Sequence, residues 1–211
     1  MSETRILPLE LPLFPLKGVI LLPGETLPLN VFEPRYLNMV DDARFGEGHI
    51  GIVQTREGGT VEMPRLAGVG CAGRIEHFEE TSDGRYLILL RGISRFELEE
   101  ERVTRSPYRI ARASYRHFAQ DLEPPREPKV ERERFFRLLQ TWFAQEGIGL
   151  NWDTIGETPL HRIVDQLSMN APFNAAERDR LLRARDCVAR LVVMEDIVAA
   201  RLAGVADGPA H

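Results

Sequence analysis

The spacing of apolar residues divides the chain into two regions. From residue 6 to about residue 118, apolar and polar positions alternate over short runs, as in the FELE sequence at residues 96–99. This period of two predicts half-buried β-strands, and the SDG sequence at residues 82–84 marks a hairpin turn between two such runs. Beyond residue 130, apolar residues recur every three or four positions, which predicts helices. The pattern therefore predicts an α+β protein.

The first strands are expected in a segment that is apolar and rich in proline. Residues 13–36 read LFPLKGVILLPGETLPLNVFEPRY. Lys17 and Glu25 interrupt this run and its prolines remove backbone donors, so it does not read as a membrane-spanning helix. Proline is tolerated at strand starts and edges. We expect strands at Ile6–Leu9, Val19–Leu22 and Leu27–Phe32, with a turn at Pro23-Gly24.

One helix is predicted within the strand region, between Pro34 and Gly46. Proline suits the first helical turn, and Tyr36, Val40 and Ala43 follow at helical spacing. The EPRY sequence at residues 33–36 is therefore the expected junction between a strand and this helix.

A proline-rich segment, DLEPPREPK at residues 121–129, has the composition of a semi-rigid connector. Apolar stripes typical of helices follow it, first at Phe135, Leu138, Leu139 and Trp142 and last between Asp186 and Leu202. Thr158-Pro159 and the capping-box-like segment from Asn174 to Glu177 predict helix starts. We expect a β domain at residues 1–120, the connector at 121–129, a bundle of about four helices at 130–204 and a flexible tail at 205–211.

Composition limits the partners and the cellular location that we expect for the protein. The 211 residues carry a net charge of −5, which gives no global attraction to nucleic acid or to anionic membranes. The first ten residues lack the features of a secretory signal. Cys71 and Cys187 are far apart in the sequence, which indicates two buried, inert thiols rather than a disulfide framework. We therefore expect a cytoplasmic protein with no membrane partner.

Several motifs that could carry chemistry have simpler interpretations. The five histidines show no metal-ligand spacing, so no metal is expected. Asp41 and Asp42 are adjacent on a predicted helix and favour a solvated polar face. Gly68, Gly70 and Gly73 form GxGxxG inside a predicted strand with no helix after it, which favours close backbone packing over a dinucleotide site. No cofactor is expected.

The segment at residues 102–118, RVTRSPYRIARASYRHF, contains five arginines, three aromatic residues and no acidic residue. Arginines with stacking aromatics are typical of single-stranded nucleic-acid binding. As strands, however, the segment divides its arginines between two faces, with Arg102, Arg112 and Arg116 on one side and Arg105 and Arg109 on the other. The ELEEE sequence at residues 97–101 offers them acidic partners across a hairpin. We favour this second interpretation.

The helix after the connector is rich in aromatic residues. Phe135, Phe136, Trp142 and Phe143 are expected to lie mostly in the core of the bundle. Their position just after the connector leaves open that they line a groove between the two domains.

Three separated blocks of the sequence resemble a known family. They are LPLFPLKGVILLPGETLPLNVFEPRYLNMVDDA (residues 11–43), VGCAGRIEHFEETSDGRYLILLRGISRF (69–96) and DQLSMNAPFNAAERDRLLRARDCVARL (165–191). In this order they resemble stand-alone members of the N-terminal, substrate-binding domain family of the Lon ATP-dependent proteases. The resemblance implies a PUA-like pseudobarrel followed by a helical bundle.

The resemblance does not extend to catalysis. A P-loop ends in Gly-Lys-Ser/Thr, whereas the two lysines, Lys17 and Lys129, are followed by glycine and valine. Neither lysine lies near a serine in a peptidase-like context, so a Ser-Lys pair is not expected, and the sequence ends where the family's ATPase domain would begin. We therefore expect no catalytic residues and no enzyme activity.

The function predicted is a non-catalytic module that binds unfolded or extended polypeptide, or an adaptor for a protease or chaperone. The resemblance implies binding residues at the EPRY junction and in the LRGISRF block, namely Glu33, Arg35, Tyr36, Arg91 and Arg95. A strand edge of the β domain would provide affinity through backbone hydrogen bonds. The alternative is RNA binding through Arg102, Arg105, Arg109, Arg112 and Arg116, because PUA-like folds also occur in RNA-binding proteins; the acidic composition disfavours it.

Overall fold

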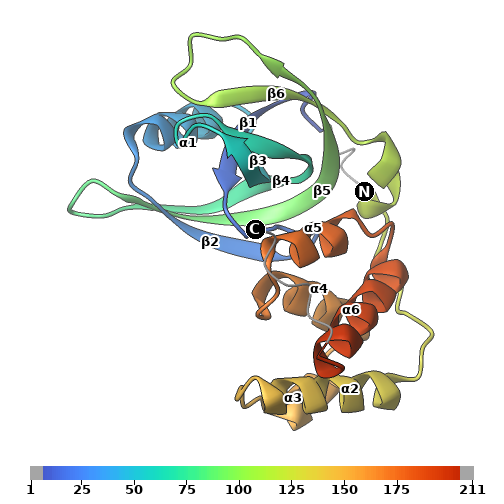
Figure 1. The fold of residues 1–211 in the computed structure, drawn as a ribbon. Coiled ribbons are helices and arrows are strands. Elements are labelled where there is room, and N and C mark those ends of the chain that lie inside the picture. Colours follow the sequence, from blue (N-terminus) through green and yellow to red (C-terminus); the bar gives the residue numbers. More distant parts are fainter. Residues whose placement is uncertain (1–6, 205–211) are drawn as a thin grey trace.

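The structure is a computed structural model that describes residues 7–204, except for the side chains of residues 153 and 154. Figure 1 shows a strand-rich part, residues 10–122, that carries one α-helix, and a group of helices beneath it, residues 132–202. We call these parts the sheet unit and the helical unit. The α+β class predicted from the sequence is confirmed.

Six strands form one sheet in the order β2-β5-β4-β3-β1-β6. Their bounds are Glu10–Leu16 (β1), Thr26–Val31 (β2), His49–Gly59 (β3), Pro64–Glu80 (β4), Tyr86–Arg102 (β5) and Arg109–Ser114 (β6). The long β5 pairs with β2 through its first half and with β6 through its second half. Five strands therefore close into a ring, and β2 lies at an edge. The description of this ring as PUA-like stays a prediction.

Two of the three strands expected near the N-terminus are placed differently. The first strand begins at Glu10, after the predicted range Ile6–Leu9, whose first residue lies outside the described residues. The strand predicted at Val19–Leu22 is wrong, because this segment pairs with no strand although most of it is buried. The strand at Leu27–Phe32 and the turn at Pro23-Gly24 are confirmed.

Gly92 explains why the segment before β2 is irregular and yet buried. A Cβ at Gly92 would lie 2.1 Å from the carbonyl oxygen of Leu22. The Gly92 N–H donates to the carbonyl of Glu25, and its carbonyl accepts from the Gly24 N–H, both at 2.9 Å. The segment thus crosses β5 at a distance that only glycine permits.

Glycines within β4 serve the same kind of close packing. A Cβ at Gly70 would lie 2.5 Å from the carbonyl oxygen of Ile52, and one at Gly73 would lie 2.9 Å from the Leu21 side chain. The interpretation of GxGxxG as close strand packing is confirmed at these two positions.

The helix α1 (Pro34–Phe45) packs on the sheet through Tyr36, Met39, Val40 and Ala43, which confirms the predicted stripe. Its two adjacent acidic residues accept hydrogen bonds from tyrosines of the sheet unit. The Tyr86 hydroxyl donates to Asp41 at 3.2 Å, and the Tyr108 hydroxyl donates to Asp42 at 2.6 Å.

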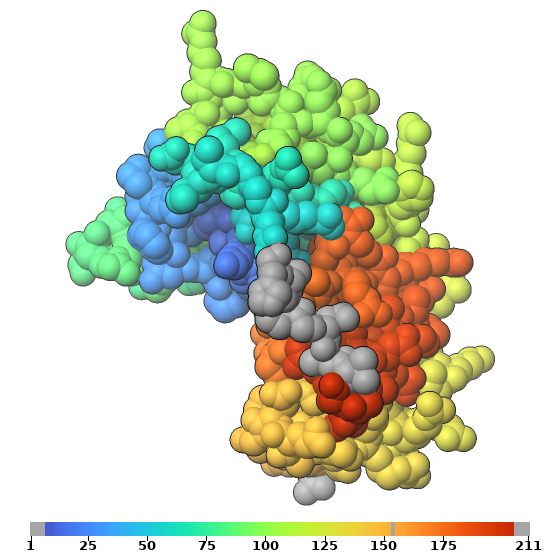
Figure 2. Space-filling view, in the orientation of Figure 1, coloured from blue at the N-terminus to red at the C-terminus, as the bar shows by residue number. Residues whose placement is uncertain are grey.

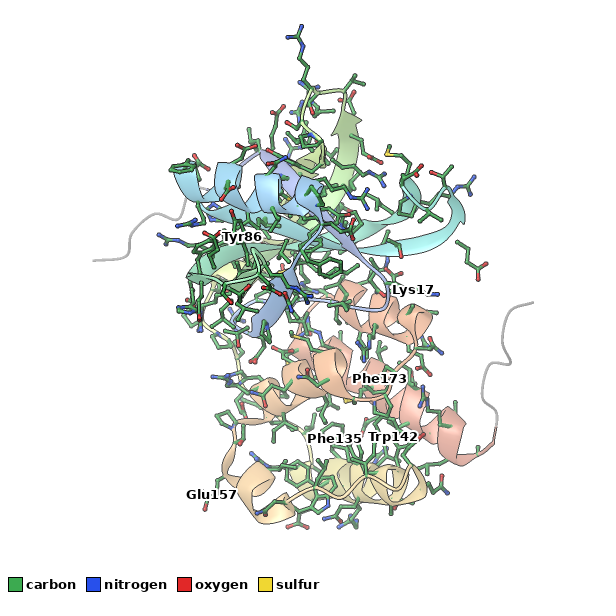
Figure 3. All side chains as sticks on the ribbon, turned by 90° about the vertical axis from the view of Figure 1, so that its left-hand side faces the viewer. Lys17, Tyr86, Phe135, Trp142, Glu157 and Phe173 are labelled. Carbon is green, nitrogen blue, oxygen red and sulfur yellow. The ribbon has the colours of Figure 1, made fainter. Side chains whose placement is uncertain are left out.

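The helical unit contains α2 (Arg132–Gln145), α3 (Trp152–Glu157), α4 (Leu160–Asn170), α5 (Ala175–Arg183) and α6 (Cys187–Leu202). A 3-10 helix, η1 (Arg116–Leu122), closes the sheet unit before the connector. Figure 3 shows Phe135, Trp142 and Phe173 pointing into the space between helices, and all three are buried in one core cluster. The aromatic residues of α2 therefore form the helical core, with Trp142 only 1% exposed, and do not line a groove beside the sheet.

Helix starts were predictable where a local cap is present. Asn174 and Glu177 form the predicted capping box, with hydrogen bonds of 2.9 and 2.7 Å. The prediction at Thr158-Pro159 is wrong by one residue, because Pro159 has an extended ψ of 137° and is itself the N-cap. The capping acceptor comes instead from the connector, where the Glu127 carboxylate accepts from the Leu160 N–H at 2.6 Å.

A buried arginine joins the two units. The side chain of Arg95 on β5 is 1% exposed and pairs with Asp121 of η1, whose Oδ1 lies 2.7 Å from Nη2. The same guanidinium donates to the backbone carbonyls at the end of α5, those of Leu182, Ala184 and Arg185. Because these bonds converge on one side chain, Arg95 fixes the position of α5 relative to β5.

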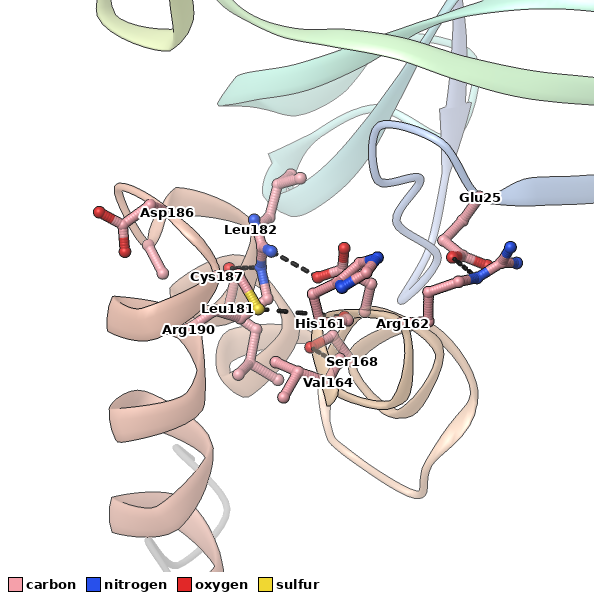
Figure 4. Close-up of polar contacts among 12 residues, drawn as sticks. Glu25, His161, Arg162, Val164, Ser168, Leu181, Leu182, Asp186, Cys187 and Arg190 are labelled. Carbon is pink, nitrogen blue, oxygen red and sulfur yellow. Dashed lines mark hydrogen bonds and ion pairs between the residues drawn. The ribbon is translucent and has the colours of Figure 1, made fainter. Parts of the chain in front are cut away.

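Further polar contacts surround this joint. Arg162 of α4 pairs with Glu25 of the sheet unit at 3.2 Å (Figure 4). Arg178 of α5 donates to the carbonyl of Gly18 at 2.6 Å. Figure 4 also shows Arg190 of α6 bonded within the helical unit, where its Nε donates to the Leu181 carbonyl at 3.1 Å. Two buried guanidinium groups therefore hold the end of α5, that of Arg95 on β5 and that of Arg190 on α6.

Candidate functional site

The strand β4 continues past the end of its neighbour β3. The last β3–β4 pair is His49 with Arg74, whereas β4 stays paired with β5 as far as Glu80. On the side away from β5, no strand among the described residues pairs with residues 76–80. This stretch is therefore a free strand edge, with backbone groups available to another extended chain.

A groove opens at the start of this free edge. It has a volume of about 350 Å³ and is lined by Arg44 at the end of α1, by residues 46–48 of the following loop and by residues 74–78 of β4. Phe45, which directly precedes the lining loop, is 90% exposed. We call this feature the β4 groove. An extended peptide in it would lie against the strand edge with apolar surface close by.

The walls of the β4 groove carry both signs of charge beside apolar surface. The Arg44 guanidinium lies over the Phe78 ring, 3.4 Å from its centroid. Glu76 is paired with Arg91 of β5 at 3.6 Å. Behind the groove, burial lowers the pKa of His49 at the start of β3 below its usual value, against the opposing effect of Glu47 and with the help of Arg74.

The residues predicted at the EPRY junction lie together on another surface. The Arg35 guanidinium pairs with Glu33 at 2.9 Å, lies 4.6 Å from the Tyr36 ring centroid and donates to the carbonyl of Glu62 at 3.2 Å. Tyr36 is 7% exposed and belongs to the core, and burial raises the pKa of its hydroxyl despite the opposing effect of Arg35. The junction thus ties α1 to the loop between β3 and β4.

The two residues predicted in the LRGISRF block are separated by the fold. Arg91 is partly exposed and reaches Glu76 in the wall of the β4 groove. Arg95 is the buried joint and presents no exposed donor to a ligand. The structure therefore does not bring the five predicted binding residues into one site.

The five arginines of segment 102–118 are also divided. Arg109 pairs with Glu101 at 2.6 Å and Arg112 with Glu99 at 3.2 Å, as the ELEEE interpretation predicted. These two arginines lie three positions apart on β6, so they project to opposite faces. Arg102 pairs with Glu10 at 3.0 Å. Arg105 and Arg116 are exposed.

The aromatic residues of this segment are not free to stack on bases. Tyr108 and Phe118 are buried, and Tyr115 is partly buried with its hydroxyl bonded to the carbonyl of Pro8 at 2.8 Å. Paired arginines and covered rings give no support to the RNA-binding alternative.

Two further properties of the described residues concern metal binding and membrane-spanning helices. Among residues 7–204, no group of three His, Cys, Asp or Glu side chains is arranged to hold a metal ion. In the same part of the chain, no helix has the length and apolar character needed to cross a bilayer.

Comparison with solved structures identifies the class of fold. A Lon N-terminal domain protein from Xanthomonas campestris superimposes with a TM-score of 0.63 and is 28% identical, over 88% of this chain and 96% of that one. The N-terminal domain of a Lon protease of the Mycobacterium avium complex gives the same TM-score over 90% of this chain and 98% of that one, at 16% identity. The fold is therefore that of Lon N-terminal domains.

Comparison at the level of sequence identifies the family. The family model described as the ATP-dependent protease La (LON) substrate-binding domain matches residues 10–200, so this chain belongs to that family. The Lon protease of Parabacteroides distasonis is 30% identical over 188 residues, which is 83% of this chain. The Lon protease of Flavobacterium johnsoniae is 30% identical over 107 residues. The matched parts span only 22% and 13% of these two proteases.

Proposed function

We propose that this chain is a non-catalytic module that binds unfolded or extended polypeptide in the β4 groove. Membership of the substrate-binding domain family supports the class of ligand. The observation that carries the proposed site is the free edge of β4 beside a groove whose lining loop directly follows a nearly fully exposed phenylalanine, Phe45. Strand addition obtains affinity from backbone hydrogen bonds, which suits a module that accepts many sequences.

The walls of the groove carry both signs of charge, which suits the binding of many different sequences. Arg44, Arg74 and His77 lie near Glu47 and Glu76, so client side chains of either charge find a complementary neighbour. Phe45 adds apolar contact of the kind that unfolded chains expose and folded proteins bury. Selectivity for unfolded clients then follows from the need for a free, extended backbone.

The proposal places the chain in ATP-dependent proteolysis, either as a module that binds clients or as an adaptor to a protease. The expected division into a β domain (1–120), a connector (121–129) and a helical domain (130–204) belongs to this proposal, as does a cytoplasmic location. The tail at residues 205–211 lies outside the described residues.

Binding is best measured by fluorescence anisotropy of a labelled client. Trp142 is buried in the helical core and Trp152 packs against the same core, so intrinsic fluorescence would not report on the β4 groove. The client is a reduced polypeptide alkylated with iodoacetamide, which cannot refold, and its native disulfide-bonded form is the control. We expect the unfolded form to bind and the native form not to bind.

Two variants with matched chemistry locate the site. Phe45→Ser removes the exposed ring that directly precedes the lining loop and should weaken client binding about fivefold, since covering half a phenylalanine contributes about 1 kcal/mol. Phe32→Ser removes a 62% exposed ring beside the EPRY junction and should leave binding unchanged. The opposite result would move the site to Glu33, Arg35 and Tyr36. A client peptide N-methylated at alternate residues should bind far more weakly than its unmethylated form, and equal binding would exclude strand addition.

A further inference from the structure

A second surface of this protein carries three arginines, of which two share a single carboxylate and the third has no carboxylate partner among the described residues. Residues 55–68 form an arm of β3 and β4 that extends beyond the last β1–β3 pair, Leu16 with Gln54, and precedes the first β4–β5 pair, Val69 with Glu97. Arg56 and Arg65 lie directly opposite each other in this arm. Like charges at directly opposite positions destabilise a strand pair, so the Arg56–Arg65 pair lowers the stability of the arm.

A third arginine reaches the arm from α5. Arg56 and Arg183 both contact the same oxygen, Oδ2 of Asp179, each at 2.8 Å. Among the described residues, no carboxylate pairs with Arg65. Arg56 and Arg183 therefore share one carboxylate, whereas Arg65, which lies opposite Arg56 in the strand pair, has none. We call Arg56, Arg65 and Arg183 the arginine cluster.

Glycines give these side chains room on the arm. A Cβ at Gly58 would lie 3.1 Å from Cδ of Arg65, and a Cβ at Gly68 would lie 3.6 Å from Nη2 of Arg183. The arginines thus lie along backbone that no side chain covers. Their side chains remain accessible, since those of Arg56 and Arg183 are 51% and 40% exposed.

The surroundings extend the positive surface. Figure 2 shows the arm, in cyan, lying directly above the helices in orange that include α5. Arg180 and Arg185, in and just after α5, are exposed, and Figure 3 shows Lys17 on the side of the sheet unit that faces the helices. The arm also carries the exposed Glu57 and Glu62, but the arginines and Lys17 outnumber these two carboxylates and Asp179, so the surface keeps a local positive field that attracts anions.

The chemistry of the surface favours one kind of anion. Single-stranded nucleic acids are bound by cations interleaved with exposed aromatic rings. The exposed apolar residues at the tip of the arm are Val61 and Met63, and neither is aromatic. Asp179 already shows how a carboxylate fits between two of these guanidinium groups. A partner carboxylate would be held in the same way by Arg65 and its neighbours.

We propose that the arginine cluster binds acidic stretches, rich in Asp and Glu, of client polypeptides. This inference rests on the proposed function in that the partner is a polypeptide, but it uses a surface distinct from the β4 groove. An acidic client segment seated on the arm relieves the repulsion between Arg56 and Arg65, and its apolar neighbours contact Val61 and Met63. The module then prefers clients in which acidic and apolar residues alternate.

The sharpest test is Arg65→Glu, because this change should not lower the stability of the fold but should lower the affinity for acidic peptides. The change converts a like-charge cross-strand pair into an opposite-charge pair, so the midpoint of urea unfolding should stay equal or rise. Affinity for a labelled, unstructured 20-residue peptide rich in Asp and Glu should fall by about tenfold at low salt. A Gln/Asn analogue of the peptide should bind wild type more weakly than the acidic form, and raising the salt should remove the difference.

Matched measurements separate this inference from the proposed function. Arg126→Gln removes an exposed arginine in the connector and should leave acidic-peptide binding unchanged. The neutral unfolded client should bind Arg65→Glu as it binds wild type, whereas Phe45→Ser should weaken it. Equal affinity of wild type for acidic and neutral peptides would overturn the arginine-cluster proposal and leave the β4 groove standing. Tighter binding of a single-stranded RNA than of the acidic peptide, lost in Arg65→Glu, would also overturn it.

Discussion

Replacing Arg95 with methionine is expected to remove a large part of the stability of the fold. The side chain makes five hydrogen bonds, and in the variant the Asp121 carboxylate, 7% exposed, stays buried without its counter-ion. Removing one partner of a buried ion pair costs about 3–5 kcal/mol. Domains are typically stable by about 5–15 kcal/mol, so a loss near 4 kcal/mol is easily measured.

Urea unfolding followed by far-UV circular dichroism measures this loss. The matched control is Arg102→Met, whose partner Glu10 is exposed, and it should cost less than about 1 kcal/mol. Arg95→Lys should recover little, because an ammonium group cannot reach the carboxylate and several carbonyls together. If Arg95→Met cost no more than Arg102→Met, Arg95 would not be the joint between the units.

Three further predictions concern other contacts. Gly92→Ala should destabilise the fold by more than about 1 kcal/mol in urea unfolding, because its Cβ would meet the Leu22 carbonyl at 2.1 Å; a neutral effect would show that the segment before β2 moves freely. Burial opposes ionisation of Glu127, yet bonds from His161 and the α4 backbone hold its pKa below the usual 4.5. Its contribution to stability is thus present above pH 4.5 and lost as the pH falls through the lowered value, and Glu127→Gln should flatten the acid limb of a stability curve against pH. Burial raises the pKa of Cys71 strongly and that of Cys187 to about 12, so Ellman's reagent at pH 8 should react with neither thiol until urea unfolds the protein.

The sequence predicted what local contacts determine. The capping box at Asn174 and the α1 stripe were predictable because each depends on residues a few positions apart. The pairing of Arg109 and Arg112 with the ELEEE segment was predictable because a hairpin brings neighbouring segments together. The role of Arg95 as the joint between the two units could not be predicted, because its backbone partners at the end of α5 lie about ninety positions away in the sequence.

The β4 groove could not be predicted for a related reason. A free edge exists because β4 has 17 residues and β3 has 11, and their register leaves the end of β4 unpaired. Alternation of apolar residues indicates a strand but not which of its edges is covered. Phe45 is the last residue of α1, and only the fold shows that its ring is exposed.

The two proposed surfaces depend differently on the joint at Arg95. The β4 groove is built from α1, the following loop and β4, all within the sheet unit. The arginine cluster spans both units, because Arg183 lies on α5 and Arg56 and Arg65 lie on the arm. Releasing α5 should therefore separate Arg183 from the arm while leaving the groove in place. At a temperature where circular dichroism shows Arg95→Met to be folded, its preference for acidic over neutral peptide should fall, and binding of the neutral unfolded client should persist. Loss of both activities together would mean that the groove also needs the helical unit, and an unchanged acidic preference would mean that Arg56 and Arg65 alone form the anion site.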